Sequence, residues 1–272
     1  MIISDTSALV LNWTSKDVWK SDNARKYFES LDLTSADSLY KRFDEQMNLI
    51  QTHLLTNRKF FIRKCVVDFL EQCKTKNEPG QVIILAAGID PLSVEIASLY
   101  PYSKVFDVDK YSMQEKEKHL NGISSNIKFI ECDITNTKLL KENLLQNGWD
   151  ENQSSIVIIE GITYYLTEEE LKKIFAFFAQ HVSNFACDFG INPECVIEKN
   201  RMIGVEIVSK VTQMVNIEFM NCYTPDCFLE LIEQSGFENV QRFKMAEIQK
   251  ERTGEITPFE EGESAWVTLV KN

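Results

Sequence analysis

The sequence lacks the long apolar stretches that mark a membrane span or an export signal. One of its longest purely apolar runs covers only residues 82–87, whereas a helix that crosses a bilayer needs roughly 20 apolar residues. The first residues, Met1 to Asp5, contain no basic cluster, and the acidic Asp5 interrupts the apolar start. We therefore expect a cytoplasmic protein without a membrane partner.

Glycine, proline and positive charge are also scarce. The 272 residues include 10 glycines and 6 prolines, which disfavours collagen-like, linker-like and turn-rich all-β chains. The 41 acidic residues outnumber the 29 basic ones, which gives a formal net charge of −12. Such a chain repels a phosphate backbone, and we expect no nucleic-acid partner.

The seven cysteines form no recognisable ligand motif. No Cys-x-x-Cys or Cys/His spacing typical of a zinc site is present, and their number is odd. We expect buried free thiols in a reducing compartment, and no metal site.

Helical patterns dominate the first 78 residues. Apolar residues recur at helical spacing from Leu39 to Leu54 and again from Phe61 to Cys73, and an earlier helix is expected at about 17–28. A turn-rich break follows at 74–80. These patterns predict a helical extension over residues 1–78 and a core domain over residues 79–272.

In the core, short apolar segments alternate with amphipathic helices. Strands are expected at 81–85, 104–108, 127–131, 155–159 and 184–189. The helices between them begin at recognisable caps, such as Asp90-Pro91 and the capping box of Thr167 and Glu170. This alternation predicts an α/β fold, with a parallel sheet and helices on both faces.

The end of the chain has a different pattern. A mostly helical insertion is expected after the fifth strand, with residues 191–223 as a lid over a ligand crevice. Two strand-like segments, about 239–248 and 265–270, then follow with no helix between them. They predict a hairpin that leaves the last strand antiparallel in a mostly parallel, seven-stranded sheet.

Small and acidic residues follow the predicted strands, where ligands bind in open parallel sheets. The turn Ala86–Asp90 after the first strand lets a ligand approach the backbone. Asp107 and Asp109 end the second strand, and we favour Asp109, at the tip, as the acceptor for two ribose hydroxyls. Asp133 follows the third strand and Glu160 the fourth. Together they predict a site for a nucleoside-containing cofactor.

Several of these segments resemble motifs of the leucine carboxyl methyltransferase family, which includes bacterial O-methyltransferases of polyketide synthesis. The similar segments are Val82–Asp90, Phe106–Asp109, Glu160–Leu166 and the arginine-bearing Asn57–Phe61. The resemblance implies a Rossmann-like class I methyltransferase fold that binds S-adenosyl-L-methionine and releases S-adenosyl-L-homocysteine. A departure is Ala86, where the family usually has glycine.

The resemblance also implies roles for individual residues. Arg58, or the competing Arg63, would hold the methionine carboxylate of the cofactor, and Glu160 would face its amino group. Tyr165 would lie beside the methyl donor, with Tyr164 next to it. The remaining cofactor contacts would come from the ends of the first three strands: Ala87, Gly88, Asp109, Asp133 and Ile134.

We therefore expect an O-methyltransferase that acts on a carboxylate or acidic hydroxyl of a small molecule, as a monomer or homodimer. None of the three histidines follows a strand, which favours an acceptor that needs no base. Arg201, in the insertion, is a candidate partner for an anionic substrate. Three alternatives remain open: a protein C-terminal carboxylate as acceptor, a catalytically idle nucleoside-binding protein, and an NAD-dependent oxidoreductase. The last expects a fuller G-x-G-x-x-G than this turn offers.

Overall fold

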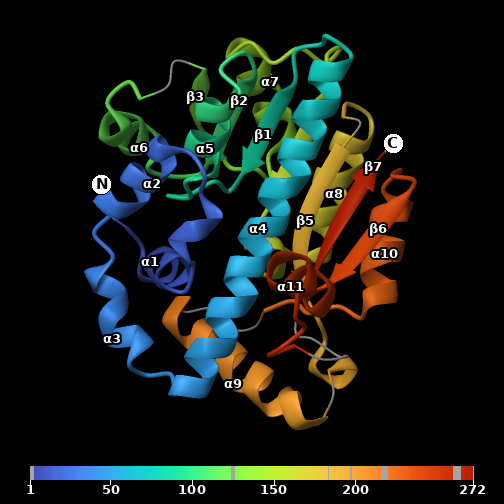
Figure 1. Ribbon diagram of the computed structural model, residues 1–272. Coiled ribbons are helices and arrows are strands. Elements are labelled where there is room, and N and C mark those ends of the chain that lie inside the picture. The colour runs from blue at the N-terminus through green and yellow to red at the C-terminus, as the bar shows by residue number, and fades with distance from the viewer. Residues whose placement is uncertain are drawn as a thin grey trace.

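The computed structural model describes residues 3–123, 126–182, 184–196, 198–215, 220–259 and 265–271. Within these ranges the chain forms a seven-stranded sheet in the order β3-β2-β1-β4-β5-β7-β6 (Figure 1). The strands are β1 (Gln81–Leu85), β2 (Lys104–Asp109), β3 (Ile127–Glu131), β4 (Ser155–Ile159), β5 (Asn184–Gly190), β6 (Val240–Lys244) and β7 (Ala265–Lys271). The pairs among β1 to β5 are parallel, and β7 runs antiparallel to both of its neighbours. The predicted α/β class and the antiparallel last strand are confirmed.

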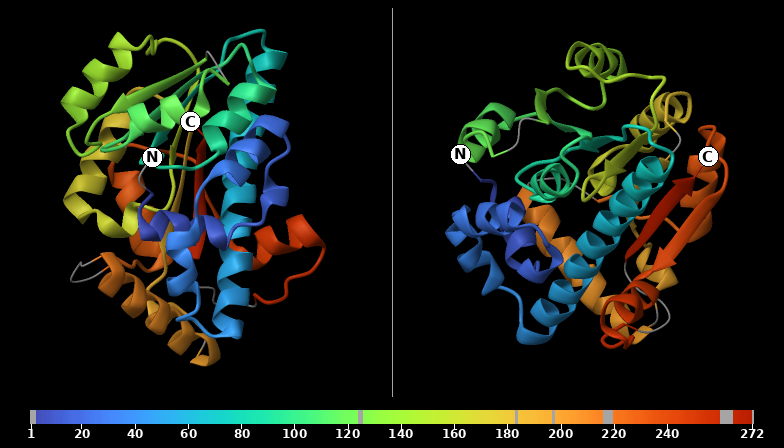
Figure 2. Two further views of the ribbon diagram at one scale, coloured as in Figure 1. Left: turned by 90° about the vertical axis from the view of Figure 1, so that its left-hand side faces the viewer. Right: turned by 45° about the horizontal axis from the view of Figure 1, so that its top comes forward.

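Helices precede the sheet and cover both of its faces. Those before the sheet are α1 (Asp5–Asn12), η1 (Lys16–Val18), α2 (Asp22–Ser30), η2 (Thr34–Ala36), α3 (Asp37–Tyr40) and α4 (Glu45–Thr75). Those within the core are α5 (Leu92–Leu99), α6 (Met113–Leu120), α7 (Thr137–Gln146), η3 (Thr163–Tyr165), α8 (Glu168–Ala179), η4 (Pro193–Cys195), α9 (Glu198–Val215), α10 (Pro225–Gln234) and α11 (Met245–Thr253). The left view of Figure 2 shows α4 on one side of the sheet and α8 on the other.

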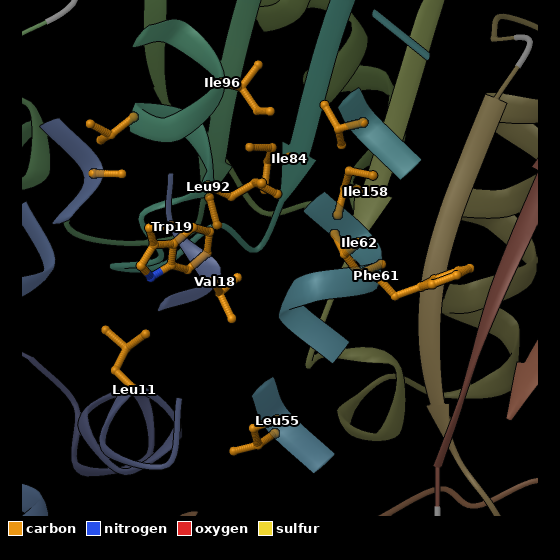
Figure 3. Close-up of a cluster of buried hydrophobic side chains, with 14 of the residues drawn as sticks. Leu11, Val18, Trp19, Leu55, Phe61, Ile62, Ile84, Leu92, Ile96 and Ile158 are labelled. Carbon is orange, nitrogen blue, oxygen red and sulfur yellow. The ribbon is translucent and has the colours of Figure 1, made fainter. Parts of the chain in front are cut away.

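The alternation of side chains along each strand builds two core layers. In β1, Ile84 packs on the side of α4, α5 and the N-terminal helices, whereas Ile83 and Leu85 pack on the side of α7, α8 and α10. Figure 3 shows the first layer, in which Ile84 and Ile158 of the sheet lie near Ile62 of α4. The N-terminal helices therefore share their hydrophobic core with the sheet.

The 31-residue helix α4 is the longest element of the described chain, and its N-cap is Asp44, whose side chain accepts from the backbone N–H of Met47. The sequence patterns predicted two helices here, with Leu39 in the first. That prediction is wrong, because Leu39 belongs to α3 and a single unbroken helix covers Glu45 to Thr75. No glycine or proline interrupts this stretch. The continuous helix packs against both β4 and β5.

Two further predictions need correction. The expected helix at 17–28 is divided into η1 and α2, because Ser15 and Ser21 each cap a new start. The expected strand at 239–248 ends at Lys244, and α11 follows at once, so β6 and β7 are not joined by a plain hairpin. The side chain of Glu247 accepts from the backbone N–H of Lys244 at 2.9 Å, which favours a helix start at this point.

The cysteines are all free thiols, but not all are buried. Cys65, Cys73, Cys132 and Cys187 are buried, whereas Cys195 and Cys227 are exposed and Cys222 is half-buried. In the described part of the chain, no helix combines the length and the apolar character that crossing a membrane requires.

The strand order reverses direction between β1 and β4. From β1 the chain proceeds outward through β2 to β3, and then returns to place β4 on the other side of β1. A crevice is expected at the carboxyl ends of the two strands that flank such a reversal. The turn Ala86–Asp90 and the segment that begins at Glu160 both lie there.

The turn after β1 holds Ala86 at a φ of +53°, a left-handed conformation that costs an L-residue roughly 1 kcal/mol or more. We predict that Ala86→Gly leaves the free energy of unfolding unchanged or raises it by up to about 1 kcal/mol, because relief of strain offsets the entropy of glycine. The control, Ala87→Gly, removes a buried methyl group at a residue without positive φ, and should destabilise by about 1 kcal/mol. Urea unfolding measures both, and equal losses would contradict the predicted strain.

Candidate active site

A first cavity opens at the carboxyl ends of β1, β2 and β4, beneath α1 and α4. Its wall combines small residues of the turn after β1 with charged residues from four elements. The lining residues are Thr6, Ser7, Val10, Leu11, Arg58, Lys59, Ile84, Leu85, Ala86, Ala87, Gly88, Ile89, Asp90, Leu92, Asp109, Glu160, Gly161, Ile162 and Tyr165.

The turn after β1 is fixed to the tip of β2. The backbone N–H of Gly88 donates to Oδ2 of Asp109 over 2.8 Å. Gly88 has a φ of +48°, and a Cβ built on it would meet no other atom within 4 Å. The space beside its backbone is therefore open to a ligand. Among the described residues, Oδ1 of Asp109 makes only a long contact of 3.4 Å to the N–H of Tyr111.

Two cations of α4 meet the carboxylate of Glu160 at the end of β4. Oε1 of Glu160 accepts from Nε of Arg58 and pairs with Nζ of Lys59, each at 2.8 Å. Lys59 also pairs closely with Asp90. Burial alone would lower the pKa of Lys59, but Asp90 and Glu160 outweigh it and raise that pKa. Lys59 is therefore a fixed positive charge in the wall of the first cavity.

The guanidinium of Arg58 joins the ends of β4 and β5. Its exposed fraction is 5%, and Nη1 donates to Oδ2 of Asp188 at 3.0 Å and to the hydroxyl of Tyr164 at 2.8 Å. That hydroxyl donates in turn to Oδ2 of Asp188 at 2.8 Å, and Oδ1 of Asp188 accepts from the N–H of Gly161 at 2.7 Å. The network therefore uses both carboxylate oxygens of Asp188.

Burial of Tyr164, together with the negative charge of Asp188, raises the pKa of the phenol well above its usual range, although Arg58 opposes this shift. The phenol therefore keeps its proton at neutral pH and cannot act as a base. Burial also raises the pKa of Tyr165. No hydrogen bond to the hydroxyl of Tyr165 is formed by the described residues.

A second, largely apolar cavity adjoins the first. Aliphatic side chains from α1, α4, the β5–η4 segment and α9 form most of its wall, with Arg58, Asp188 and Arg201 as its charged members. The sequence of α9 has apolar residues at helical spacing: Ile203, Ile207, Val208, Val211 and Val215. Ile207, Val208 and Val211 belong to this wall, whereas the side chains of Ile203 and Val215 lie outside the described set. Both cavities share Val10, Arg58, Gly161 and Tyr165.

The structure brings most of the predicted site residues together. Members of the two cavity walls are Arg58, Ala87, Gly88, Asp109, Glu160, Tyr164 and Tyr165. Arg63 lies about one turn further along α4 and does not reach either of these cavities. It pairs instead with the buried Glu95 of α5. The arginine at the site is therefore Arg58.

Asp133, Ile134 and Asp107 lie outside both cavity walls. The carboxylate of Asp133 pairs with Lys110 at 2.9 Å and accepts from Thr135, which lowers its pKa to about 2. Ile134 is buried in the core layer of α7 and α8. Asp107 is fully buried and pairs with Lys116. The adenine role of Asp133 and Ile134 stays a prediction.

Sequence reasoning missed three charged residues of the site. Asp188 is a lone acid at the end of the apolar strand β5, the same signal that identified Glu160. Asp90 was recognised as a helix cap and as part of the turn after β1, but not as a charged residue of the site, and its side chain does accept from the N–H of Leu92 at 2.8 Å. Lys59 does not follow a strand and lies within a long helix. The sequence alone does not show which side of that helix faces the cavity, so Lys59 could not be assigned to the site.

No histidine lines either of these cavities. His119 contacts Ser30, His181 lies near Glu151, and His53 lies near Arg252. Among the described residues, no group of three or more His, Cys, Asp or Glu side chains is placed to hold a metal ion.

Comparison with known proteins gives one family and one curated relative. The sequence profile described as leucine carboxyl methyltransferase matches residues 4–179. YktD of Bacillus subtilis, described as a candidate S-adenosyl-L-methionine-dependent methyltransferase, is 26% identical over 164 residues. That match covers 57% of this chain and 53% of YktD, so the chain spans about half the length of this relative.

Solved structures share the fold at low sequence identity. A DUF574 family protein from Streptomyces avermitilis is 13% identical, with a TM-score of 0.65 that covers 98% of this chain and 97% of that one. A protein from Thermobifida fusca, described as a candidate methyltransferase, is 12% identical, with a TM-score of 0.63 that covers 95% and 94%. These similarities establish a common α/β architecture.

We predict that Tyr164→Phe lowers the free energy of unfolding by about 1–3 kcal/mol, because it removes a buried hydroxyl that bonds to two charged groups. Its neighbour is a matched control, since Tyr165→Phe removes a hydroxyl without a partner among the described residues and should cost less than about 0.5 kcal/mol. Urea unfolding of both variants measures this difference. Equal losses would mean that the hydroxyl of Tyr164 does not stabilise the network.

Proposed function

Because the chain belongs to the leucine carboxyl methyltransferase family, we propose that it is an S-adenosyl-L-methionine-dependent methyltransferase that methylates an oxygen atom. The proposed acceptor is a carboxylate or an acidic hydroxyl of a small molecule. The observation that carries the proposal is the shared wall of the two cavities, where a polar, charged cavity meets an apolar one at Arg58, Gly161 and Tyr165.

The chemistry of the first cavity fits the cofactor. Its wall holds the cations Arg58 and Lys59 and the carboxylates Asp90, Asp109 and Glu160, a surplus of one negative charge. When bound, S-adenosyl-L-methionine supplies an electrophilic methyl group on a positively charged sulfur, with a carboxylate and an ammonium at its amino-acid end. The surplus negative charge of the wall complements the net charge of that group.

Each residue of the first cavity has a proposed part in holding the cofactor. Asp109, with Oδ1 nearly unengaged, would accept from ribose hydroxyls, and the open backbone at Gly88 would let the chain of the cofactor pass. Oε2 of Glu160 has no partner among the described residues, and would face the ammonium group. Arg58 and Lys59 are the cations available to its carboxylate.

The groups of the second cavity next to the shared wall favour an acceptor that is already ionised. Tyr164 keeps its proton, Asp188 is fully engaged by Arg58, Tyr164 and Gly161, and no histidine lines either cavity. The described residues therefore offer no free base at this point. A carboxylate is ionised at neutral pH and needs none, whereas an ordinary phenol with a pKa near 10 benefits from one. The wall's part is to align the acceptor oxygen and exclude water.

The second cavity is the proposed acceptor site, and the segment 191–223 its proposed cover. Incubation of the protein with S-adenosyl-L-methionine and a panel of aliphatic and aromatic carboxylic acids, phenols and amines tests the assignment. We expect S-adenosyl-L-homocysteine and an O-methylated product by mass spectrometry. Methylation of the amines alone would contradict oxygen transfer. Binding of NAD in place of S-adenosyl-L-methionine, measured by calorimetry, would favour an oxidoreductase.

We predict that Asp109→Ala weakens S-adenosyl-L-methionine binding by about 1.5–3 kcal/mol, roughly 10- to 150-fold, because it removes an ionised acceptor for ribose hydroxyls. Glu131→Ala is the matched control, since it removes an exposed acid from the end of the neighbouring strand, outside the cavity wall. Calorimetry measures both affinities. An affinity for the Asp109 variant within twofold of wild type would discard the ribose assignment.

We predict that Glu160→Gln weakens S-adenosyl-L-methionine by about 1–3 kcal/mol more than it weakens 5′-methylthioadenosine, which lacks the amino-acid end. The amide keeps the shape and one acceptor oxygen for Arg58, but removes the charge that the ammonium group needs. Titration of both ligands into wild type and variant gives the difference. An equal loss for the two ligands would mean that Glu160 acts by positioning Arg58 and Lys59 only.

A further inference from the structure

The second cavity contains a positive charge that no acid of the described residues pairs with. Arg58, the other cation of this cavity, forms ion pairs with Asp188, which also lines the cavity, and with Glu160, which does not. Arg201 lines the same cavity and pairs with no carboxylate among the described residues. In a chain with a net charge of −12, this guanidinium is an isolated positive charge beside an apolar surface.

The hydrogen bonds of Arg201 are incomplete. Its Nη2 donates to the backbone carbonyl oxygens of Val196 at 3.2 Å and Glu194 at 3.4 Å. Its Nε is buried and has no hydrogen-bond partner in the described part of the chain. A buried N–H group of a charged side chain that lacks a partner is costly. Nη1 also has no hydrogen-bond partner among the described residues, and unlike Nε it is not fully buried. Nη1 is therefore an unused donor that an oxygen of a ligand can reach.

The position of Arg201 separates it from the methyl-transfer point. Methyl transfer requires the acceptor atom to lie where the two cavities meet, and the residues common to both walls are Val10, Arg58, Gly161 and Tyr165. Arg201 belongs to the wall of the second cavity alone. A group bound to Arg201 is therefore distinct from the group that receives the methyl.

We infer that the acceptor is an apolar molecule with a second, anionic group, a carboxylate or sulfonate, and that Arg201 binds this anion. The inference rests on the proposed function, because it takes the second cavity as the acceptor site. The aliphatic side chains of α1, α4 and α9 would cover the apolar body of such a molecule, and its methylated product would keep one negative charge.

Two fluorescent probes that differ in one anionic group test the inference. 8-Anilinonaphthalene-1-sulfonate carries a sulfonate, and N-phenyl-1-naphthylamine has the same aromatic body without it. Affinities of both probes for wild type, Arg201→Met, Arg201→Lys and Lys210→Met are measured, with and without S-adenosyl-L-homocysteine. Lys210→Met is the matched control, because Lys210 lies on the same helix and contacts Glu206 and the carbonyl of Arg42, outside the cavity wall.

We expect Arg201→Met to weaken the sulfonate probe about tenfold or more, with the neutral probe changed less than twofold, because only the former loses a charge-assisted hydrogen bond. Arg201→Lys should recover part of the preference, and Lys210→Met should leave both affinities unchanged. An equal loss of both probes would mean that Arg201 only supports the fold of 194–196, and an unchanged sulfonate affinity in Arg201→Met would also overturn the inference.

The same titrations separate this inference from the proposed function. Failure of S-adenosyl-L-homocysteine to bind would contradict the proposed cofactor, whereas the difference between the two probes in its absence still reports on Arg201. Conversely, normal cofactor binding with no probe difference would overturn the anion site alone.

Discussion

The buried guanidinium of Arg58 is the interaction on which the arrangement of the site depends. It reaches from the middle of α4 to Glu160 at the end of β4 and to Asp188 at the end of β5. A charge with 5% exposure is tolerated only when acids and hydrogen bonds compensate its lost hydration. The partners come from the ends of β4 and β5 and from η3, so the guanidinium ties the position of α4 to three other elements.

The same network divides one crevice into two chemically different cavities. On one side Lys59, Asp90 and Glu160 make a polar wall, and on the other the aliphatic side chains of α1, α4 and α9 make an apolar one. Tyr164 bridges Arg58 and Asp188 with a proton that it does not release, so this boundary holds its shape without offering a base. A rigid boundary of this kind suits a displacement reaction, in which alignment and exclusion of water contribute more than proton transfer.

Local patterns were sufficient to predict the sheet and the strand-end residues of the site. The five parallel strands are short apolar runs, and a small turn or an acid after such a run marks a carboxyl end. The errors lie where the pattern stays helical or strand-like past a boundary: a single α4 in place of two helices, and α11 after Lys244. Glu160 was expected to face the amino group of the cofactor, yet Arg58 and Lys59 already pair with its carboxylate. Arg58 and Lys59 lie about 100 residues before Glu160 in the sequence. They reach its carboxylate because α4 packs against the sheet.

The unbroken course of α4 explains why two cations and an apolar face can serve both cavities. Successive residues of a helix point about 100° apart, so Arg58 and Lys59 diverge, one toward Asp188 and one toward Asp90. Leu54 and Leu55, one turn earlier, face the second cavity, and Arg63, about one turn later, turns away to Glu95. If the helix were broken between the two apolar patterns, between Leu54 and Phe61, the directions of these side chains would no longer be fixed relative to one another. Because α4 is continuous, the same short segment supplies both the charged residues between the cavities and part of the apolar wall of the second cavity.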